Sequence, residues 1–141
     1  MMKMTINDIS VLYGSIEKLK GKNLPAKLSY IISRNSQILQ AEVAAAENAR
    51  LDLCKKMAKK DKDGNPVMVK KKDGSEAYDV PNMPELISAV SEMYQTEVEV
   101  EIKTLPISID DLMALCDAPK YDALSAYDIE TIEKMLSAPE K

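Results

Sequence analysis

The chain has 141 residues, of which 45% are hydrophobic and 30% are charged, and its formal net charge is −4. This length and composition predict one folded domain with a modest core and exclude a disordered chain. The sequence contains no histidine, which removes the commonest general base and metal ligand and excludes Ser-His-Asp and Cys-His chemistry.

Residues 4–20 carry the first helical pattern. Apolar side chains recur there at spacings of three and four, namely Ile6, Ile9, Leu12, Tyr13, Ile16 and Leu19. Thr5 or Asn7 is the candidate N-cap, and Gly21 ends the pattern. The link to the next helical stretch is short, so we expect the two helices to pack as a hairpin.

Residues 24–60 form the longest uninterrupted helical pattern, with Asn23 as a candidate N-cap and Pro25 near the start. An apolar stripe repeats every seven residues at Ile32, Leu39, Ala46 and Leu53, and Val43 and Met57 widen it. Such a helix would be roughly 55 Å long. A compact domain of this size is only roughly 37 Å across, so we expect an elongated molecule.

The stripe of this long helix is the candidate interface, and its members are Ile32, Leu39, Val43, Arg50, Leu53 and Met57. A narrow, partly polar seam suits self-association or a partner helix. The alternative is that the neighbouring helices cover the stripe completely, so that it forms the core. The sequence leaves both interpretations open.

Charge is unevenly distributed along the chain. Residues 55–72 contain eight lysines and two aspartates, and the candidate basic patch comprises Lys55, Lys56, Lys59, Lys60, Lys70, Lys71 and Lys72. From residue 97 onward, eleven acidic residues face four lysines. The lysines lack interleaved aromatic residues for base stacking, so we expect no nucleic-acid partner and favour a solvated surface. Such asymmetry can also let one end of a molecule meet the other end of its neighbour.

The middle of the chain predicts a small antiparallel sheet. Residues 67–69 and 76–80 flank an Asp73-Gly74 turn and read as a β-hairpin. Asn82 caps a predicted helix over 82–94. Residues 96–104 then alternate between apolar and charged side chains, which predicts a third strand paired with the hairpin.

Two short helices complete the predicted fold. One opens near Asp110, and the other follows a capping box made by Ser125 and Asp128. The fold class is therefore α+β and mainly helical, with a long-helix hairpin and a small antiparallel sheet. We predict a single domain over 1–141, made of a helical hairpin (1–60), a β-hairpin (61–80) and a C-terminal part (82–141) of helix, strand and short helices.

No catalytic residue, metal site or cofactor site is predicted. Asp61, Asp63 and Asn65 start like a calcium loop, but Pro66 and Lys72 stand where glycine and glutamate are needed. Glu97, Glu99 and Glu101 are expected to form the wet face of a strand. Cys54 and Cys116 are expected to be reduced thiols of an intracellular protein. No apolar run reaches the roughly 18 residues of a membrane span, and the polar start is no secretory signal.

The order of these elements resembles a group of small proteins encoded by tailed phages of Gram-positive bacteria. The resemblance rests on five stretches, which are Leu24-Pro25-Ala26-Lys27-Leu28-Ser29-Tyr30 with Ile32 and Asn35, Asp63-Gly64-Asn65-Pro66-Val67, Glu97-Val98-Glu99-Val100, the Pro-Ile-Ser step from Pro106 to Ser108, and Leu124-Ser125-Ala126-Tyr127-Asp128. It implies a viral origin and a place in the cytoplasm of the infected host.

Taken together, these patterns predict a non-enzymatic, self-associating protein that binds another protein. The resemblance implies that it is an accessory to particle assembly or host takeover. The alternative is an inhibitor of a bacterial anti-phage defence system, which would bind a defence protein, mimic nucleic acid or sequester a nucleotide signal.

Overall fold

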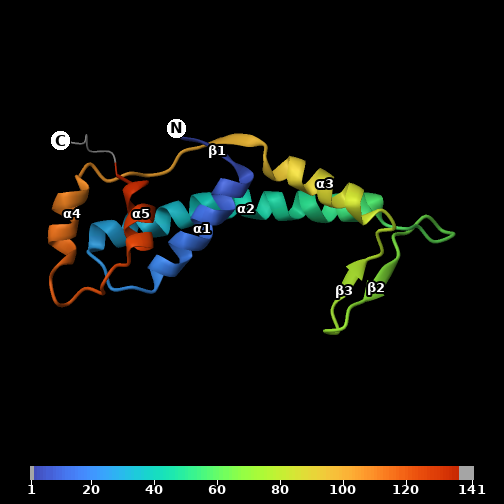
Figure 1. The fold of residues 1–141 in the computed structure, drawn as a ribbon, viewed down its shortest axis with the longest axis horizontal. Helices are drawn as coiled ribbons and strands as arrows, with labels where there is room; N and C mark the ends of the chain where they lie inside the picture. Colours follow the sequence, from blue (N-terminus) through green and yellow to red (C-terminus); the bar gives the residue numbers. More distant parts are fainter. Residues whose placement is uncertain (1, 137–141) are drawn as a thin grey trace. The chain divides into compact units, whose positions relative to one another are not determined.

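Five helices and two short antiparallel ribbons make up the computed structural model, which describes residues 2–136 (Figure 1). In chain order the elements are β1 (Met2–Thr5), α1 (Ile6–Lys20), α2 (Ala26–Met57), β2 (Met68–Lys70), β3 (Glu76–Tyr78), α3 (Met83–Tyr94), β4 (Glu97–Val100), α4 (Ile109–Cys116) and α5 (Ala126–Glu133). The predicted α+β, mainly helical fold class is confirmed. Within residues 2–136, none of the helices has the length and apolarity that crossing a bilayer requires.

The chain divides into two compact units. Unit 1 consists of residues 1–43 and 97–141, and unit 2 consists of residues 44–96. The first part of α2 therefore belongs to unit 1, and its second part belongs to unit 2.

The helices of unit 1 begin where side chains can bind free backbone N–H groups. The Thr5 hydroxyl accepts a hydrogen bond from the Asp8 amide at 3.0 Å, and the Asp8 carboxylate accepts one from the Thr5 amide, which completes a capping box. Ser125 and Asp128 form the same arrangement before α5, as the sequence predicted. Ser108 caps α4.

The predicted cap of α2 at Asn23 is wrong. The Pro25 carbonyl accepts the first bond of this helix, from the Ser29 amide at 2.9 Å. The Asn23 side chain instead donates to the Lys120 carbonyl, and its backbone N–H donates to the Asp122 carboxylate at 2.6 Å. Asn23 thus ties the link between α1 and α2 to the loop before α5.

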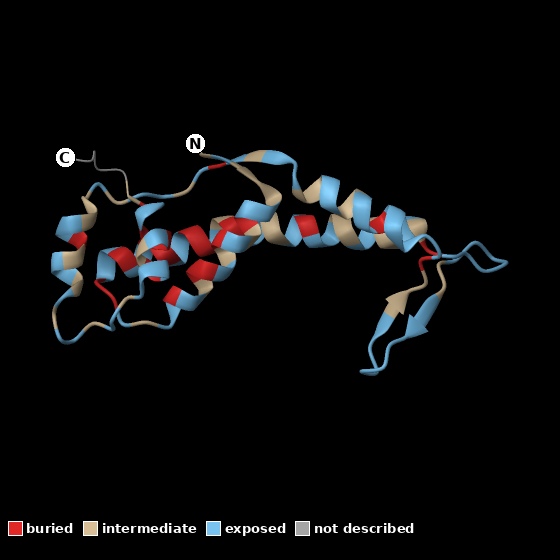
Figure 2. Ribbon diagram, in the orientation of Figure 1, coloured by how far each residue is buried: buried red, intermediate tan, exposed pale blue. Residues whose placement is uncertain are grey.

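The hydrophobic core of unit 1 lies between α1, the first part of α2 and the C-terminal helices (Figure 2). Its fully buried members are Ile9, Leu12, Ile16 and Leu19 from α1, Leu28, Ile32 and Leu39 from α2, Leu112 from α4, and Ile132 and Met135 from the C-terminal end. The helical hairpin formed by α1 and α2 is confirmed, and Ser36 on α2 also donates a hydrogen bond to Glu17 on α1.

The predicted pairing of the strand at 96–104 is wrong. Strand β4 pairs antiparallel with β1 instead of with the hairpin, in a register that places Met4 opposite Val98 and Met2 opposite Val100. All four side chains pack against the core of unit 1. The apolar face of β4 therefore finds its cover in unit 1, and β1 supplies the edge that satisfies its backbone.

Unit 2 contains the second part of α2, the β-hairpin and α3. Strands β2 and β3 pair antiparallel with Met68 opposite Tyr78, around a turn in which Gly74 has φ 88°. This confirms the predicted hairpin. The Lys59 amide donates to the Asp79 carbonyl at 2.7 Å, which holds the base of the hairpin to the end of α2. Asn82 caps α3, as predicted, by accepting from the Glu85 amide at 3.2 Å.

Candidate functional site

The first half of the predicted seam is core. Ile32 and Leu39 are fully buried in unit 1, and Val43 is half-buried against the same cluster. A partner cannot reach Ile32 or Leu39 while unit 1 is folded. For these positions the structure favours the alternative interpretation, in which the neighbouring helices cover the stripe.

The second half of the seam lies in unit 2 and remains partly exposed. Arg50, Leu53 and Met57 are each half-buried. The Arg50 guanidinium holds Glu47 through two contacts, Nε to Oε2 at 3.0 Å and Nη2 to Oε1 at 2.5 Å. This pairing raises the pKa of Arg50 and lowers the pKa of Glu47, chiefly through the hydrogen bonds between the two groups. Of the six predicted seam residues, only Arg50 lines the groove that the next paragraph describes.

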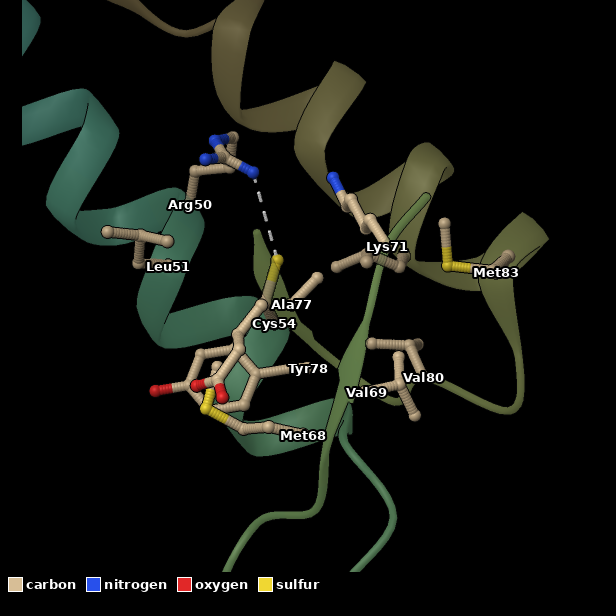
Figure 3. Close-up of a pocket in the computed structure, with 12 residues that line it drawn as sticks. Arg50, Leu51, Cys54, Met68, Val69, Lys71, Ala77, Tyr78, Val80 and Met83 are labelled. Carbon is tan, nitrogen blue, oxygen red and sulfur yellow. Dashed lines mark hydrogen bonds between the residues drawn. The ribbon is translucent and has the colours of Figure 1, made fainter. Parts of the chain in front are cut away.

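A groove of about 420 Å³ opens in unit 2 (Figure 3). All three parts of the unit contribute to its walls, and we refer to it as the unit 2 groove. Its lining residues are Arg50, Leu51 and Cys54 from α2, Met68, Val69 and Lys71 from β2 and the residue after it, Glu76, Ala77 and Tyr78 from β3, and Val80, Met83 and Leu86 from the segment that leads into and through the start of α3.

The walls of this groove expose large apolar side chains. Leu51, Met68, Val69 and Met83 keep 43–49% of their surface accessible to solvent. Scattered single apolar residues are normal on a protein surface, but a group of them around a hollow is a candidate interaction site.

The small core of unit 2 explains why these side chains are left exposed. The buried hydrophobic residues within 44–96 are Ala46, Ala58, Val80 and Leu86, of which two are alanines. A unit of this size buries a low fraction of its surface on folding. Unit 2 therefore has too few large buried side chains to cover the apolar surface of its own hairpin and helices.

One residue of the basic patch belongs to the groove. All seven predicted lysines are exposed, and Lys71 lines the groove itself. Lys60 folds back and donates to the Lys55 carbonyl at the end of α2. Within the groove, Arg50 Nη1 donates to Cys54 Sγ at 4.0 Å.

No metal-binding cluster of His, Cys, Asp or Glu occurs among residues 2–136. Both cysteines are free and partly buried, and burial raises the pKa of the Cys116 thiol. The three glutamates Glu97, Glu99 and Glu101 are exposed on and just after β4, and Lys3 on the paired strand approaches Glu97 at 3.9 Å. These groups form no constellation with a nucleophile and a base.

Sequence reasoning did not identify the groove, although a signal was present. Met68 and Val69 are consecutive apolar residues in a short strand, and Met83 directly follows the cap of the predicted helix. Apolar residues on both faces of a hairpin too small to fold alone require cover on both sides. Comparison of the chain with protein-family models, with curated proteins and with solved structures finds no match.

Proposed function

We propose that this protein acts without catalysis, by binding a protein segment in the unit 2 groove. The observation that carries the proposal is the group of four half-exposed apolar residues, Leu51, Met68, Val69 and Met83, around a hollow of about 420 Å³. An apolar side chain of a partner would add to the small core of unit 2. Binding would therefore also stabilise unit 2, since a ligand that binds only the folded state shifts unfolding.

The energetics set a limit on this interaction. Burying the exposed half of four such side chains contributes roughly 3–6 kcal/mol. Association itself costs an estimated 4–15 kcal/mol in lost freedom of motion. The groove alone does not supply a stable complex, so the partner must also make polar or charged contacts at the rim, where Lys71 lies.

The biological setting that we propose comes from the sequence resemblance to tailed-phage proteins. In that setting the protein works in the cytoplasm of an infected bacterium, as an accessory to particle assembly or host takeover. Identification of the partner decides between this role and inhibition of a defence system, because the first requires a particle or host-pathway protein and the second requires a defence protein.

Site-specific photo-cross-linking tests the groove. A cross-linking amino acid replaces Met68 in one variant and Ile87 in a control variant, since Ile87 is exposed in the same unit but does not line the groove. We expect a discrete protein adduct from position 68 and none from position 87. The purified partner should then bind Met83→Ser at least about tenfold more weakly than Ile87→Ser. Equal adducts from both positions, or equal affinity of both serine variants, would refute the proposal.

A further inference from the structure

We infer that the unit 2 groove receives a second copy of this chain, which inserts Leu115 of α4. This inference rests on the proposed function and names the partner of the same groove. It requires that unit 1 present an exposed apolar side chain in surroundings that complement the rim of the groove.

The exposed large apolar residues described for unit 1 are Val11, Tyr30, Leu115 and Tyr127. Tyr127 is already engaged, because its hydroxyl bonds to Ser15 and its ring lies 5.9 Å from the Lys18 amine.

Tyr30 and Val11 stand in the wrong electrostatic surroundings. Tyr30 lies on α2 between Lys27 and Arg34, one turn away on either side, so its surroundings are basic. Val11 has a single acidic neighbour one turn away, Asp8, and that carboxylate caps α1. Neither residue complements a lysine-bearing rim.

Leu115 has acidic neighbours on and next to its own helix, and Lys27 lines the same small hollow as Leu115. Asp111 lies four residues before it on the same face of α4, and Asp110 and Asp117 are also exposed. Over the described residues from 97 onward, ten acidic residues face three lysines. A partner helix with an apolar anchor beside carboxylates is what the groove requires.

The groove supplies the matching charge. Of its charged lining residues, Arg50 and Lys71 are basic and Glu76 is acidic. Lys70 and Lys72 are the exposed neighbours of Lys71, and residues 55–72 carry a local charge of +6. With Leu115 in the groove, Asp111 comes with it to the rim, one helical turn away. Opposite charges of this kind fix orientation and raise association rates more than they add affinity, while Leu115 supplies the apolar anchor.

Such a contact joins two different surfaces of one chain. Each copy carries both a groove and an α4, so association is heterologous, and it either closes into rings or continues into open chains. The experiment is therefore a mass measurement on the full chain by sedimentation, over a series of concentrations and at low and high salt. We expect a mass that rises with concentration, and weaker association at high salt because salt screens exposed charges.

Matched variants locate the contact. Leu115→Ser is paired with Val11→Ser, because the two side chains are equally exposed at 54% and 55%. Met68→Ser is paired with Ile87→Ser in unit 2. We expect Leu115→Ser and Met68→Ser to weaken association at least about tenfold, and the two controls to leave it unchanged. Circular dichroism verifies that all four variants are folded.

Mixing gives the decisive result. Leu115→Ser keeps an intact groove, and Met68→Ser keeps an intact α4, so the two variants mixed together should form a heterodimer at concentrations where each variant alone is monomeric. Lys71→Glu should weaken association, and addition of Asp111→Lys to the same chain should restore it. A wild-type chain that stays monomeric at every concentration overturns the inference, and so does association that Leu115→Ser leaves intact.

These outcomes are distinguishable from failure of the proposed function. A monomeric wild type whose position 68 cross-links to a different protein overturns self-association and retains the groove as a binding site. A monomer that gives no groove-specific adduct overturns both.

Discussion

Replacement of Asn35 with alanine should destabilise unit 1 by about 2 kcal/mol. The Asn35 side chain is fully buried. Its Nδ2 donates to the Lys103 carbonyl at 2.9 Å, and its Oδ1 accepts from the Lys103 amide at 2.6 Å. One side-chain amide thus pairs with both backbone groups of Lys103, a residue 68 positions away, just beyond the end of β4.

The magnitude follows from what alanine leaves behind. Each of the two hydrogen bonds contributes about 1 kcal/mol net. The freed backbone groups of Lys103 would add to this loss if they stayed enclosed, but Lys103 is an exposed residue and we expect water to replace the amide. The loss therefore stays close to the sum of the two bonds. Alanine also has a higher helix propensity than asparagine, which offsets a few tenths of a kcal/mol of this loss.

The assay is urea unfolding of the full chain combined with hydrogen exchange at the Lys103 amide. Asn48→Ala is the matched control, because Asn48 lies on the same helix and is exposed. The control should change the free energy of unfolding by less than about 0.5 kcal/mol. Hydrogen exchange reports unit 1 locally, which matters because a chain of two compact units need not unfold in a single step. An unchanged unfolding midpoint together with unchanged protection at Lys103 would refute the reasoning.

Asn35→Asp should make the free energy of unfolding depend on pH, and the direction of that dependence can be predicted. A carboxyl group at this buried position has its pKa raised by desolvation, and only its protonated form can donate to the Lys103 carbonyl. The folded variant then binds more protons than the unfolded chain, so its stability falls as pH rises through the raised pKa and is recovered on acidification. Wild-type protein has no titrating group at this position and should lack this step.

Three further perturbations test other parts of the structure. Ser125→Ala removes the N-cap of α5 and should cost about 1 kcal/mol in urea unfolding. Gly64→Ala should cost roughly 1 kcal/mol of stability in a thermal scan, because Gly64 has φ 82° and alanine is strained there. Gly21→Ala is the control, because Gly21 has φ −81°, and it should not destabilise the protein in that scan. The Ser36 hydroxyl lowers the pKa of Glu17, so this contact stabilises the fold above the ordinary carboxyl pKa and is lost as pH falls through the lowered value. Glu17→Gln should flatten that part of the stability–pH curve.

Each of these expectations can fail in a defined way. Equal stability of Ser125→Ala and wild type would show that α5 is held by packing alone. Equal melting of the Gly64 and Gly21 variants would contradict the strain argument. A stability–pH curve that Glu17→Gln leaves unchanged below the ordinary pKa of glutamate would contradict a role for the Ser36 contact.

Local signals in the sequence were sufficient for the helices and the hairpin. Thr5, Asn82 and Ser125 cap the helices that their patterns predicted, because a cap depends on residues within one turn of it. The hairpin over 67–80 was predictable for the same reason, since its turn is set by Asp73 and Gly74.

Pairings between distant segments were not predictable in this way. The alternation over 96–104 correctly indicated a half-buried strand, but nothing in it identified β1 as the neighbour. Residues 2–5 are too short to show a period of their own. The Asn35 contact to Lys103 is equally non-local, and in the sequence Asn35 was one polar residue inside a helix.

The stripe along α2 shows why periodicity identifies an apolar face but cannot assign its use. The same seven-residue repeat runs through both units. At Ile32 and Leu39 it meets α1 and the C-terminal helices, which supply enough large side chains to bury it. Beyond Val43 the residues around the helix belong to a unit whose buried hydrophobic residues are two alanines, a valine and a leucine. There the repeat includes Arg50, which lines a groove whose walls expose apolar side chains. Whether an apolar stripe becomes core or binding surface is decided by the volume of side chains opposite it, and that volume comes from segments far away in the sequence.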